Sequence, residues 1–325
     1  MMKSYKELWA LDPEITFLNH GSFGACPTTI LEMQSEMRRE LEANPMDFLH
    51  RTLESRLDAA RQRLADFIGC KFENLTFVPN ATSGVNAVLQ SISFNQTDEV
   101  IVTNHEYNAC RNTLNFVAQQ RGIKVVEVQI PYPIQRIEEA VNPILEAITS
   151  STRLLLLDHI TSATGFIMPI EPIIQECNNR GIETLIDGAH GPGMVNLQLE
   201  KLGATYYTGN CHKWICSPKG SALLYVRSEK IESIRPTVIS HGYNTLRSDR
   251  SKYLIQFGWT GTLCPTPWLC IPETIEYLGR VIPAGWTAIM ERNHRLALLG
   301  RDIICQALNV HQPCPDEFHG SMVTI

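Results

Sequence analysis

The sequence predicts an α/β protein whose core is a doubly wound, mostly parallel sheet with helices on both faces. Short apolar runs alternate with stretches of helical periodicity between residues 75 and 226, which is the pattern of parallel strands joined by crossover helices. The chain has 325 residues, 44% of them hydrophobic, which is enough for one large core with a smaller domain beside it. The expected strands are residues 75–78, 100–103, 124–130, 154–158, 184–187 and 222–226.

Two amphipathic helices are expected before the first strand. The first covers residues 27–43 and opens with Pro27, a residue suited to a first helical turn. The second ends at Gly69, a typical helix stop. Its apolar face is formed by Leu53, Leu57, Leu64 and Ile68.

Beyond about residue 265 the pattern turns helical as far as about residue 309, with a break near Pro283. Residues 321–325 have the composition of one further strand. We therefore expect an N-terminal arm, a large domain, and connecting helices that begin a smaller, truncated C-terminal domain. The corresponding ranges are 1–20, 21–265 and 266–325.

Composition and charge exclude several classes of protein. The formal net charge is -6 and no long basic run occurs, so a nucleic-acid or anionic-lipid partner is not expected. Charged residues interrupt the first twenty positions, which argues against a signal peptide or membrane anchor and favours a cytoplasmic protein. The ten cysteines show no extracellular spacing, and we expect them to remain reduced.

A small polar loop, residues 79–84, follows the first expected strand and leads into a helix. Ligands bind beyond the carboxyl ends of the strands in doubly wound sheets, and a helix start offers free N–H groups and a positive dipole to an anion. The loop can therefore hold a phosphate. It can equally be an ordinary helix start at which Thr82 or Ser83 is the capping residue, and the local sequence leaves both interpretations open.

Carboxylates stand at the ends of two expected strands. Asp187 ends the strand 184–187 and is followed by His190, and Asp158 ends the strand 154–158. A carboxylate at this edge can keep the pyridine nitrogen of a cofactor protonated, which turns the ring into an electron sink. Either residue can instead cap the next loop, and periodicity does not decide between Asp187 and Asp158.

The densest cluster of reactive side chains lies at residues 207–220, before the last expected strand. Lys213 stands there among small and aromatic residues between two apolar segments, so we expect its side chain to be partly buried. Burial disfavours the ammonium form and makes the free amine available for carbonyl chemistry. The alternative is a solvated surface lysine.

Two other kinds of site receive little support. Metal ligation by Cys211, His212 and Cys216 is a weak alternative because their spacing contains no paired CxxC arrangement. A nicotinamide site is disfavoured because Pro192 interrupts the glycine-rich stretch 188–193.

Seven motifs occur in one order along the chain. They are 19–24 (NHGSFG), 80–84 (NATSG), 105–109 (HEYNA), 161–165 (TSATG), 187–190 (DGAH), 210–214 (NCHKW) and 260–262 (TGT). Together they resemble the class V aminotransferases of the fold-type I pyridoxal 5'-phosphate (PLP) superfamily, most closely the isopenicillin N epimerase-like branch, over roughly residues 17–325. The resemblance implies a fold-type I architecture and PLP as the cofactor.

The resemblance also implies roles for the reactive residues. Lys213 would form a Schiff base with PLP and later move the proton at the substrate α-carbon. Asp187, rather than Asp158, would pair with the pyridine nitrogen, and the phenol of Tyr107 would stack on the ring.

The remaining site residues are likewise implied by the resemblance. Ser162 and His190 fall near the ring hydroxyl. Thr262 resembles a residue that reaches the phosphate of a neighbouring subunit, which implies a homodimer. Asn19 and Gly21 fall where the N-terminal arm covers the substrate carboxylate. The phosphate would be held by Ala81, Thr82, Asn210 and His212.

The C-terminal end departs from the family pattern. Family members continue past a strand like residues 321–325 into a small domain that supplies an arginine for the substrate carboxylate, and no arginine here matches it. We expect the sequence to be a truncated form rather than one with weakened substrate binding. Arg292, Arg295 and Arg301 lie at helical spacing, so a solvated helix face is their expected setting.

The leading functional hypothesis is a PLP-dependent enzyme that acts on a small amino acid through an external aldimine and an α-carbanion. Epimerisation, transamination and C–S cleavage are its possible outcomes. Persulfide-forming desulfurase chemistry is less favoured because no cysteine can be placed on a small-domain loop. The alternatives are a non-catalytic PLP-binding protein without its substrate end and a metal-dependent hydrolase that uses Asp187, His190 and His212.

Overall fold

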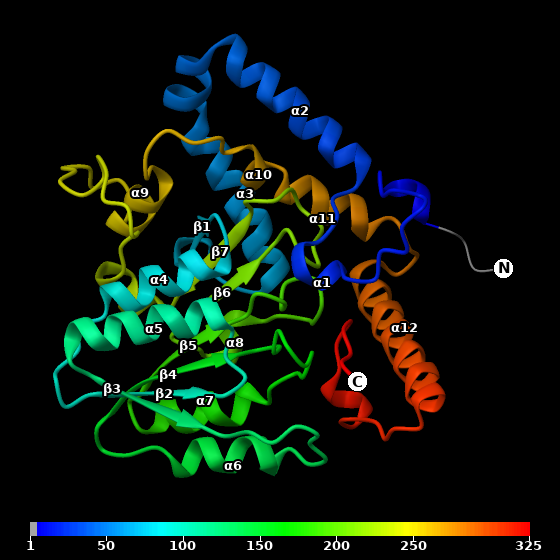
Figure 1. Ribbon diagram of the computed structural model, residues 1–325. Coiled ribbons are helices and arrows are strands. Elements are labelled where there is room, and N and C mark those ends of the chain that lie inside the picture. Colours follow the sequence, from blue (N-terminus) through cyan, green and yellow to red (C-terminus); the bar gives the residue numbers. More distant parts are fainter. Residues whose placement is uncertain (1–4) are drawn as a thin grey trace.

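A seven-stranded sheet forms the centre of the computed structural model, which describes residues 5–325 (Figure 1). The strands are β1 (Leu75–Val78), β2 (Glu99–Thr103), β3 (Lys124–Val128), β4 (Thr152–Asp158), β5 (Glu183–Asp187), β6 (Tyr206–Asn210) and β7 (Ala222–Val226). Their order is β1-β7-β6-β5-β4-β2-β3. β7 runs antiparallel to β1 and β6, and the other neighbours are parallel. The predicted mostly parallel sheet is confirmed, while residues 1–4 of the expected arm lie outside the described residues.

Strand β6 was not among the strands expected from the sequence, because its residues do not form an apolar run. Its residues are aromatic, small or polar, yet all of them are buried. The polar groups have partners, because Thr208 Oγ1 donates to Leu223 O (2.9 Å) and Asn210 Oδ1 accepts from Ala81 N (2.9 Å). A Cβ at Gly209 would lie 2.7 Å from Pro192 Cγ, so the strand packs closely against the loop after β5. Hydrogen bonding and close packing, rather than apolar composition, allow its burial.

Alternate side chains of the strands supply two cores, one on each face of the sheet. In β4, Leu154 and Leu156 enter one core, and Leu155 and Leu157 enter the other. The first core is covered by α4 (Ala81–Ser91), α5 (Asn108–Arg121) and α9 (Lys252–Gly258). The second is covered by α3 (Leu53–Ile68), α6 (Glu138–Glu146), α7 (Ile170–Asn179), α10 (Thr266–Leu269) and α11 (Ile271–Gly279). The prediction of helices on both faces is therefore confirmed (Figure 1).

Both N-terminal helices form close to their predicted ranges. α2 (Thr28–Ala43) begins directly after Pro27. α3 ends where Gly69 takes a left-handed conformation with φ 65°, which glycine adopts at little cost. A π-helical turn, Asp47–Thr52, connects the two helices. No helix in the described part of the chain is both long and apolar enough to cross a membrane.

The last five residues do not form the expected strand. After α12 (Gly285–Leu308) the chain turns back, and residues 321–325 lie against the loop that follows β4. Thr324 Oγ1 donates to Ala163 O (3.0 Å), and a Cβ on Gly165 would lie 3.1 Å from Met322 O. The segment is held by contacts with a loop, so it gains no ladder of backbone hydrogen bonds from a neighbouring strand.

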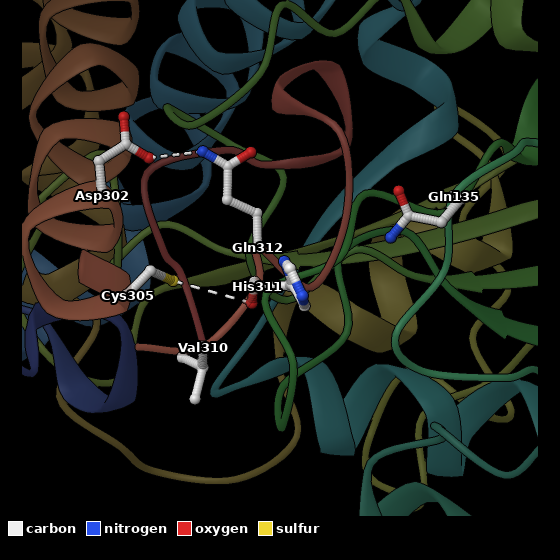
Figure 2. Close-up of a pocket in the computed structure, with 6 residues that line it drawn as sticks. All are labelled: Gln135, Asp302, Cys305, Val310, His311 and Gln312. Atoms are coloured by element: carbon white, nitrogen blue, oxygen red, sulfur yellow. Dashed lines mark hydrogen bonds between the residues drawn. The ribbon is translucent and has the colours of Figure 1, made fainter. Parts of the chain in front are cut away.

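The expectation that Arg301 lies on a solvated helix face was wrong, because its side chain is buried. Its side chain is 1% exposed and pairs with Asp302 (2.8 Å) and Asp316 (2.6 Å). The segment that follows α12 folds back along the helix, where Gln312 Nε2 donates to Asp302 (2.9 Å; Figure 2). Helical spacing cannot reveal this burial, since the covering residues lie beyond the helix. Arg295 is exposed as expected.

Candidate active site

The loops after five of the strands enclose a cavity of about 620 Å³ at the carboxyl edge of the parallel strands. Ligands bind at this edge in doubly wound sheets. Most of the residues expected at the site line it, although they come from segments far apart in the sequence. These residues are Ala81, Thr82, Tyr107, Ser162, Asp187, His190, Asn210, His212 and Lys213.

The other three expected residues do not line this cavity. Thr262 lines a separate cavity of about 690 Å³. Asn19 is exposed, and its Oδ1 accepts from Ser22 Oγ (2.8 Å), while Gly21 is buried against the C-terminal segment. The residues of this segment that line the cavity are Ser22 and Phe23, which lie just beyond the expected arm. Nothing in the sequence distinguishes these two residues from their neighbours in the same motif.

Lys213 lies on the hairpin loop between β6 and β7, and its side chain is half-buried. Its carbonyl accepts a hydrogen bond from His20 Nε2 (2.9 Å), which fixes the backbone. Its Nζ lies 3.0 Å from His190 Nε2. Burial lowers the pKa of the amine, while the carboxylates of Asp187 and Asp158 oppose this shift. The arrangement therefore favours an amine that is readily deprotonated.

Two buried carboxyl groups, Asp158 and Asp187, lie near this amine, and a third, Glu106, lies near both of them. The three are here called the acidic cluster. Asp158 and Asp187 are register partners at the ends of β4 and β5. Asp187 has two donors, because Ala189 N reaches Oδ1 (2.9 Å) and Cys110 Sγ reaches Oδ2 (3.0 Å). Burial raises the pKa of Asp187, and these two hydrogen bonds counteract the shift. Asp187 is thus the carboxyl group of the cluster best supported as an anion.

Glu106 is the member of the acidic cluster that most favours the neutral form. Both of its oxygens, and Asp158 Oδ2, are buried without a donor among the described residues. Burial first, and then the charges of Asp158 and Asp187, raise the pKa of Glu106 well above its ordinary value. A carboxylate pair contains no hydrogen to share, so contact between Glu106 and Asp158 becomes a hydrogen bond only when one of them is protonated. Glu106 was not predicted from the sequence as a site residue, although it directly precedes Tyr107.

The start of α4 has fewer free donors than the sequence suggests. Asn80 is the capping residue, rather than Thr82 or Ser83, because its Oδ1 accepts from Ser83 N (2.9 Å). Ala81 N donates to Asn210 Oδ1 (2.9 Å). Among the first three residues of α4, Thr82 therefore has the backbone donor that is best placed to receive an anion.

The histidines of the cavity already have polar partners. His190 contacts Lys213 through one ring nitrogen and accepts from Trp214 Nε1 (3.2 Å) through the other. His212 Nδ1 donates to Ser221 O (3.1 Å). Burial lowers the pKa of His190 to about 3 and that of His212 to about 4. Among the described residues, Asp187, His190 and His212 do not form a group whose ligand atoms all lie within 4.8 Å of one another, so the structure gives no support to the metal-dependent hydrolase that would use them.

The family model described as "Aminotransferase class-V" matches residues 16–316. The chain belongs to the class V aminotransferase family. Isopenicillin N epimerase of Amycolatopsis lactamdurans is 33% identical over 309 residues, which cover 91% of this chain and 77% of the relative. The enzyme of the same name from Streptomyces clavuligerus is 31% identical over 96% and 81% of the two chains. A probable L-cysteine desulfhydrase of Arabidopsis thaliana is 26% identical over 97% and 68%.

Solved structures share the fold of this chain. The apo cysteine desulfurase of Thermococcus onnurineus NA1 superposes with a TM-score of 0.81 at 20% identity, over 99% of this chain and 82% of that one. A variant of C-DES with glycine covalently linked to its PLP cofactor gives a TM-score of 0.76 at 22% identity, over 89% and 78%. The fold-type I prediction is confirmed, and this class V aminotransferase is a PLP-dependent enzyme.

The chemistry of the cavity fits this cofactor. Lys213 offers an amine whose pKa is lowered, as an aldehyde requires. Asp187 offers a buried carboxyl group that could pair with a protonated ring nitrogen, and Thr82 offers a helix start for a phosphate. All three line the same cavity.

Proposed function

We propose that this class V aminotransferase converts a small amino acid at its α-carbon, with Lys213 as the residue that holds PLP and moves the proton. PLP supplies, when bound, an aldehyde for the amine and a ring that withdraws electrons from the α-carbon. One observation carries the proposal: the Lys213 amine and the Asp187 carboxylate face one cavity of about 620 Å³.

The other residues of the cavity divide into proposed contacts with the ring and with the phosphate. Asp187 pairs with the pyridine nitrogen, and the Tyr107 ring, which is 44% exposed at the cavity, stacks on the cofactor. Ser162 and His190 lie on the side of the ring hydroxyl.

Phosphate binding is assigned mainly to Thr82, through its N–H, its hydroxyl and the dipole of α4. Asn210 supports this site indirectly, since its Oδ1 holds the Ala81 N–H. His212 contributes only if the phosphate raises its pKa from about 4, because burial keeps the ring neutral.

The relatives carry the names of two reaction classes, an epimerase and a C–S lyase. Both begin with removal of the α-proton, and so does transamination. The α-proton step is therefore the proposed common function, and exchange of the α-hydrogen in D2O, followed by NMR for a panel of amino acids, measures it directly. Inversion at the α-carbon, an α-keto acid, or released sulfide with pyruvate then identifies the outcome.

The central test is the near-visible absorption of the protein with PLP, before and after borohydride reduction, for the wild type and Lys213→Ala. We expect a band for the wild type, and after reduction a PLP mass increment on the peptide that contains Lys213. A wild type that takes up no PLP, or an increment on another lysine, would disprove the assignment of Lys213.

A non-catalytic PLP-binding protein is the rival. It predicts the same absorption band and the same modified peptide, but no exchange of α-hydrogens for any amino acid. The exchange experiment therefore separates the two functions even when PLP binding is normal.

We further propose that the functional unit is a homodimer in which Thr262 serves the site of the neighbouring copy. Thr262 lies outside the Lys213 cavity, beside α3. The loop that precedes α9 exposes large apolar side chains. Other residues of this loop line the same cavity as Thr262. Such a patch is typical of a surface that another chain covers. Its apolar residues are Val238, Ile239, Tyr243 and Leu246, of which Leu246 is 98% exposed.

Mixed dimers test the shared site. When Lys213→Ala and Thr262→Ala subunits are combined, the Lys213→Ala subunit supplies Thr262 to the intact Lys213 of its partner. We expect one restored site in each mixed dimer and activity above that of either variant alone. Activity of the mixture no higher than that of the two variants measured alone would contradict the proposal. So would a monomer in analytical ultracentrifugation.

A further inference from the structure

Trp214 hydrogen-bonds the imidazole that faces the reactive amine. Trp214 Nε1 lies 3.2 Å from His190 Nδ1, and His190 Nε2 lies 3.0 Å from Lys213 Nζ. An indole nitrogen can donate a hydrogen bond but cannot accept one. His190 Nδ1 is therefore the acceptor, and the hydrogen of the neutral imidazole must be on Nε2.

The surroundings keep His190 neutral. Its side chain is buried, and burial, with a smaller effect of the Lys213 charge, lowers its pKa to about 3. The Nε2–H group then faces Lys213 Nζ. An ammonium group has no lone pair, so this contact is a hydrogen bond only when the lysine is an uncharged amine.

We propose that Trp214 is a positioning residue whose indole N–H selects the tautomer of His190 that favours the uncharged Lys213 amine. The inference rests on the function proposed for Lys213. In the other tautomer, Nε2 would carry a lone pair and would accept a hydrogen bond from the ammonium form. The indole therefore decides whether His190 favours the free amine or the charged one.

Among the described ionisable groups near Lys213, His190 is the one that hydrogen-bonds the Trp214 indole. The two aspartates of the acidic cluster favour the ammonium form from β4 and β5. His20 packs on the Trp214 ring with a centroid distance of 5.1 Å, and a phenylalanine at position 214 keeps an aromatic ring there. The ionisable groups that face Lys213 are Asp158, Asp187, Cys110, His190 and His212.

Trp214→Phe tests the proposal, with Trp286→Phe as the matched control. Trp286 Nε1 donates to Ile275 O (2.9 Å) away from the cavity, so the control loses an indole hydrogen bond elsewhere. The measured quantity is the rate at which apoprotein takes up PLP as a function of pH. This rate rises as Lys213 loses its proton. We expect the midpoint of Trp214→Phe to move up by about one pH unit, which slows uptake roughly tenfold below both midpoints.

A double substitution distinguishes this role from a merely structural one. If Trp214 acts through His190, His190→Ala and His190→Ala/Trp214→Phe must have the same midpoint. A Trp214→Phe midpoint equal to that of the wild type, or a further shift in the double variant, would overturn the proposal. Absence of covalent PLP on Lys213 in the wild type would instead refute the function proposed above.

A measurement without cofactor keeps the test independent of how the variants fold. Nitrogen-15 NMR of histidine-labelled wild-type apoprotein reports which ring nitrogen of His190 carries the hydrogen, with His190→Ala used to assign the signal. We expect the hydrogen on Nε2. A signal from the Nδ1–H tautomer in the wild type would overturn the proposal.

Discussion

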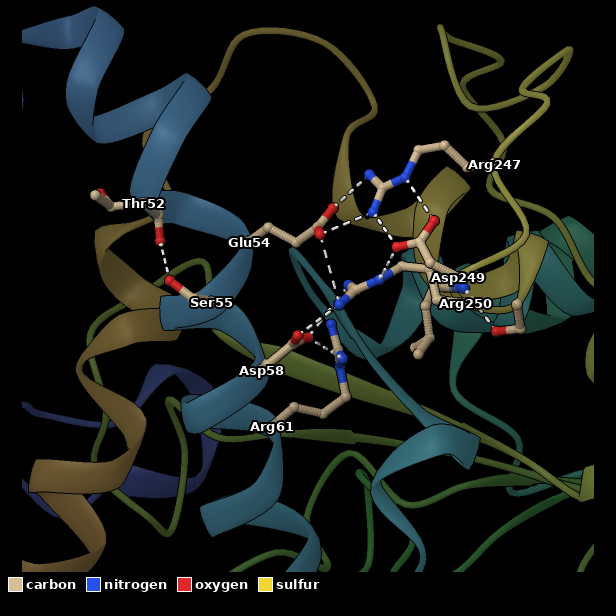
Figure 3. Close-up of polar contacts among 10 residues, drawn as sticks. Thr52, Glu54, Ser55, Asp58, Arg61, Arg247, Asp249 and Arg250 are labelled. Carbon is tan, nitrogen blue, oxygen red and sulfur yellow. Dashed lines mark hydrogen bonds and ion pairs between the residues drawn. The ribbon is translucent and has the colours of Figure 1, made fainter.

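Two groups of charged residues in this molecule differ in how their charges are balanced. The first is the acidic cluster, in which Asp158 and Asp187 act on the single amine of Lys213 and Glu106 acts on these two carboxyl groups. The second, here called the arginine network, joins α3 to the segment before α9 and matches every carboxylate with an arginine (Figure 3). Its members are Glu54, Asp58, Arg61, Arg247, Asp249 and Arg250.

The difference is one of charge balance. In the arginine network, the buried Arg61 pairs with Asp58 (2.8 Å), and Arg250 reaches the same carboxylate (2.6 Å). In the acidic cluster the carboxyl groups outnumber the nearby cations. Burial raises the pKa of Glu106, Asp158 and Asp187, and repulsion from neighbouring carboxylates raises that of Glu106 and Asp158 further. A balanced network needs no further partner, whereas an unbalanced buried cluster favours a proton or a cationic ligand. The comparison therefore separates a structural region from the site.

The largest effect is expected from Asp187→Asn, which removes the anion proposed to meet the ring nitrogen. Losing one partner of a buried charged pair costs several kcal/mol, so we expect PLP affinity to fall by at least about 100-fold. Equilibrium titration of the near-visible band measures it. Asp158→Asn is the matched control from the neighbouring strand, and an equal loss of affinity in both variants would contradict the choice of Asp187.

Asp58→Ala breaks the arginine network at the residue that two arginines share. Arg61, whose side chain is 2% exposed, would lose its carboxylate partner, and we expect the free energy of unfolding to fall by about 2–3 kcal/mol. Urea unfolding measures this change. PLP affinity should stay close to that of the wild type, and a parallel loss of both would show that the two regions are not separate.

Glu106→Gln tests the protonation of the acidic cluster through stability. The pKa of Glu106 is raised in the folded protein, so the stability it contributes is complete below its unfolded pKa and is lost as pH rises toward the folded pKa. A glutamine does not titrate. The apoprotein stability of Glu106→Gln relative to wild type should therefore increase from pH 5 to pH 7, by up to about 1.4 kcal/mol per pH unit. Urea unfolding measures the free energy of unfolding of both proteins at each pH. If their difference did not change with pH, the pKa of Glu106 would not be raised in the folded protein.

The smallest effect is expected from Arg247→Ala, at the exposed end of the arginine network. Its ion pairs with Glu54 (2.8 Å) and Asp249 (2.6 Å) are solvated, with side-chain exposures of 43% for Arg247, 48% for Glu54 and 57% for Asp249. Solvent screening leaves such pairs little net stabilisation, so the melting temperature should change by no more than about 2 °C. A loss of stability as large as that of Asp58→Ala would mean that charge balance, rather than burial, determines stability here.

Sequence reasoning predicted nine residues that the structure brings to one cavity, because most of them follow buried strands. Asp187 could be found from an apolar run that ends in a polar residue, and Lys213 from its small and aromatic neighbours between two apolar segments. The family motifs added Tyr107. Glu106 could not be recognised, since its importance depends on the distance to Asp158, a residue on another strand. The same limit explains Arg301, whose covering partner Asp316 comes from beyond its own helix.

The helix start of α4 illustrates the limit at short range. Thr82 and Ser83 are good capping residues by type, but Asn80 takes that role because its side chain reaches Ser83 N. The partner of Ala81 N is Asn210, which is distant in sequence. Local sequence thus predicted an anion site without predicting which of its donors remain available.

The antiparallel direction of β7 has a consequence for how this chain can vary. Lys213 stands on a hairpin loop with both ends tied to the sheet, where Cys211 N donates to Ser221 O (3.0 Å) and Ser217 N to Cys211 O (3.1 Å). A crossover such as the one between β4 and β5 can absorb an inserted residue by moving its helix, α7. An insertion between β6 and β7 has no helix to move, and would displace the amine itself. Length polymorphism should therefore be tolerated in the crossovers and strongly disfavoured in this hairpin.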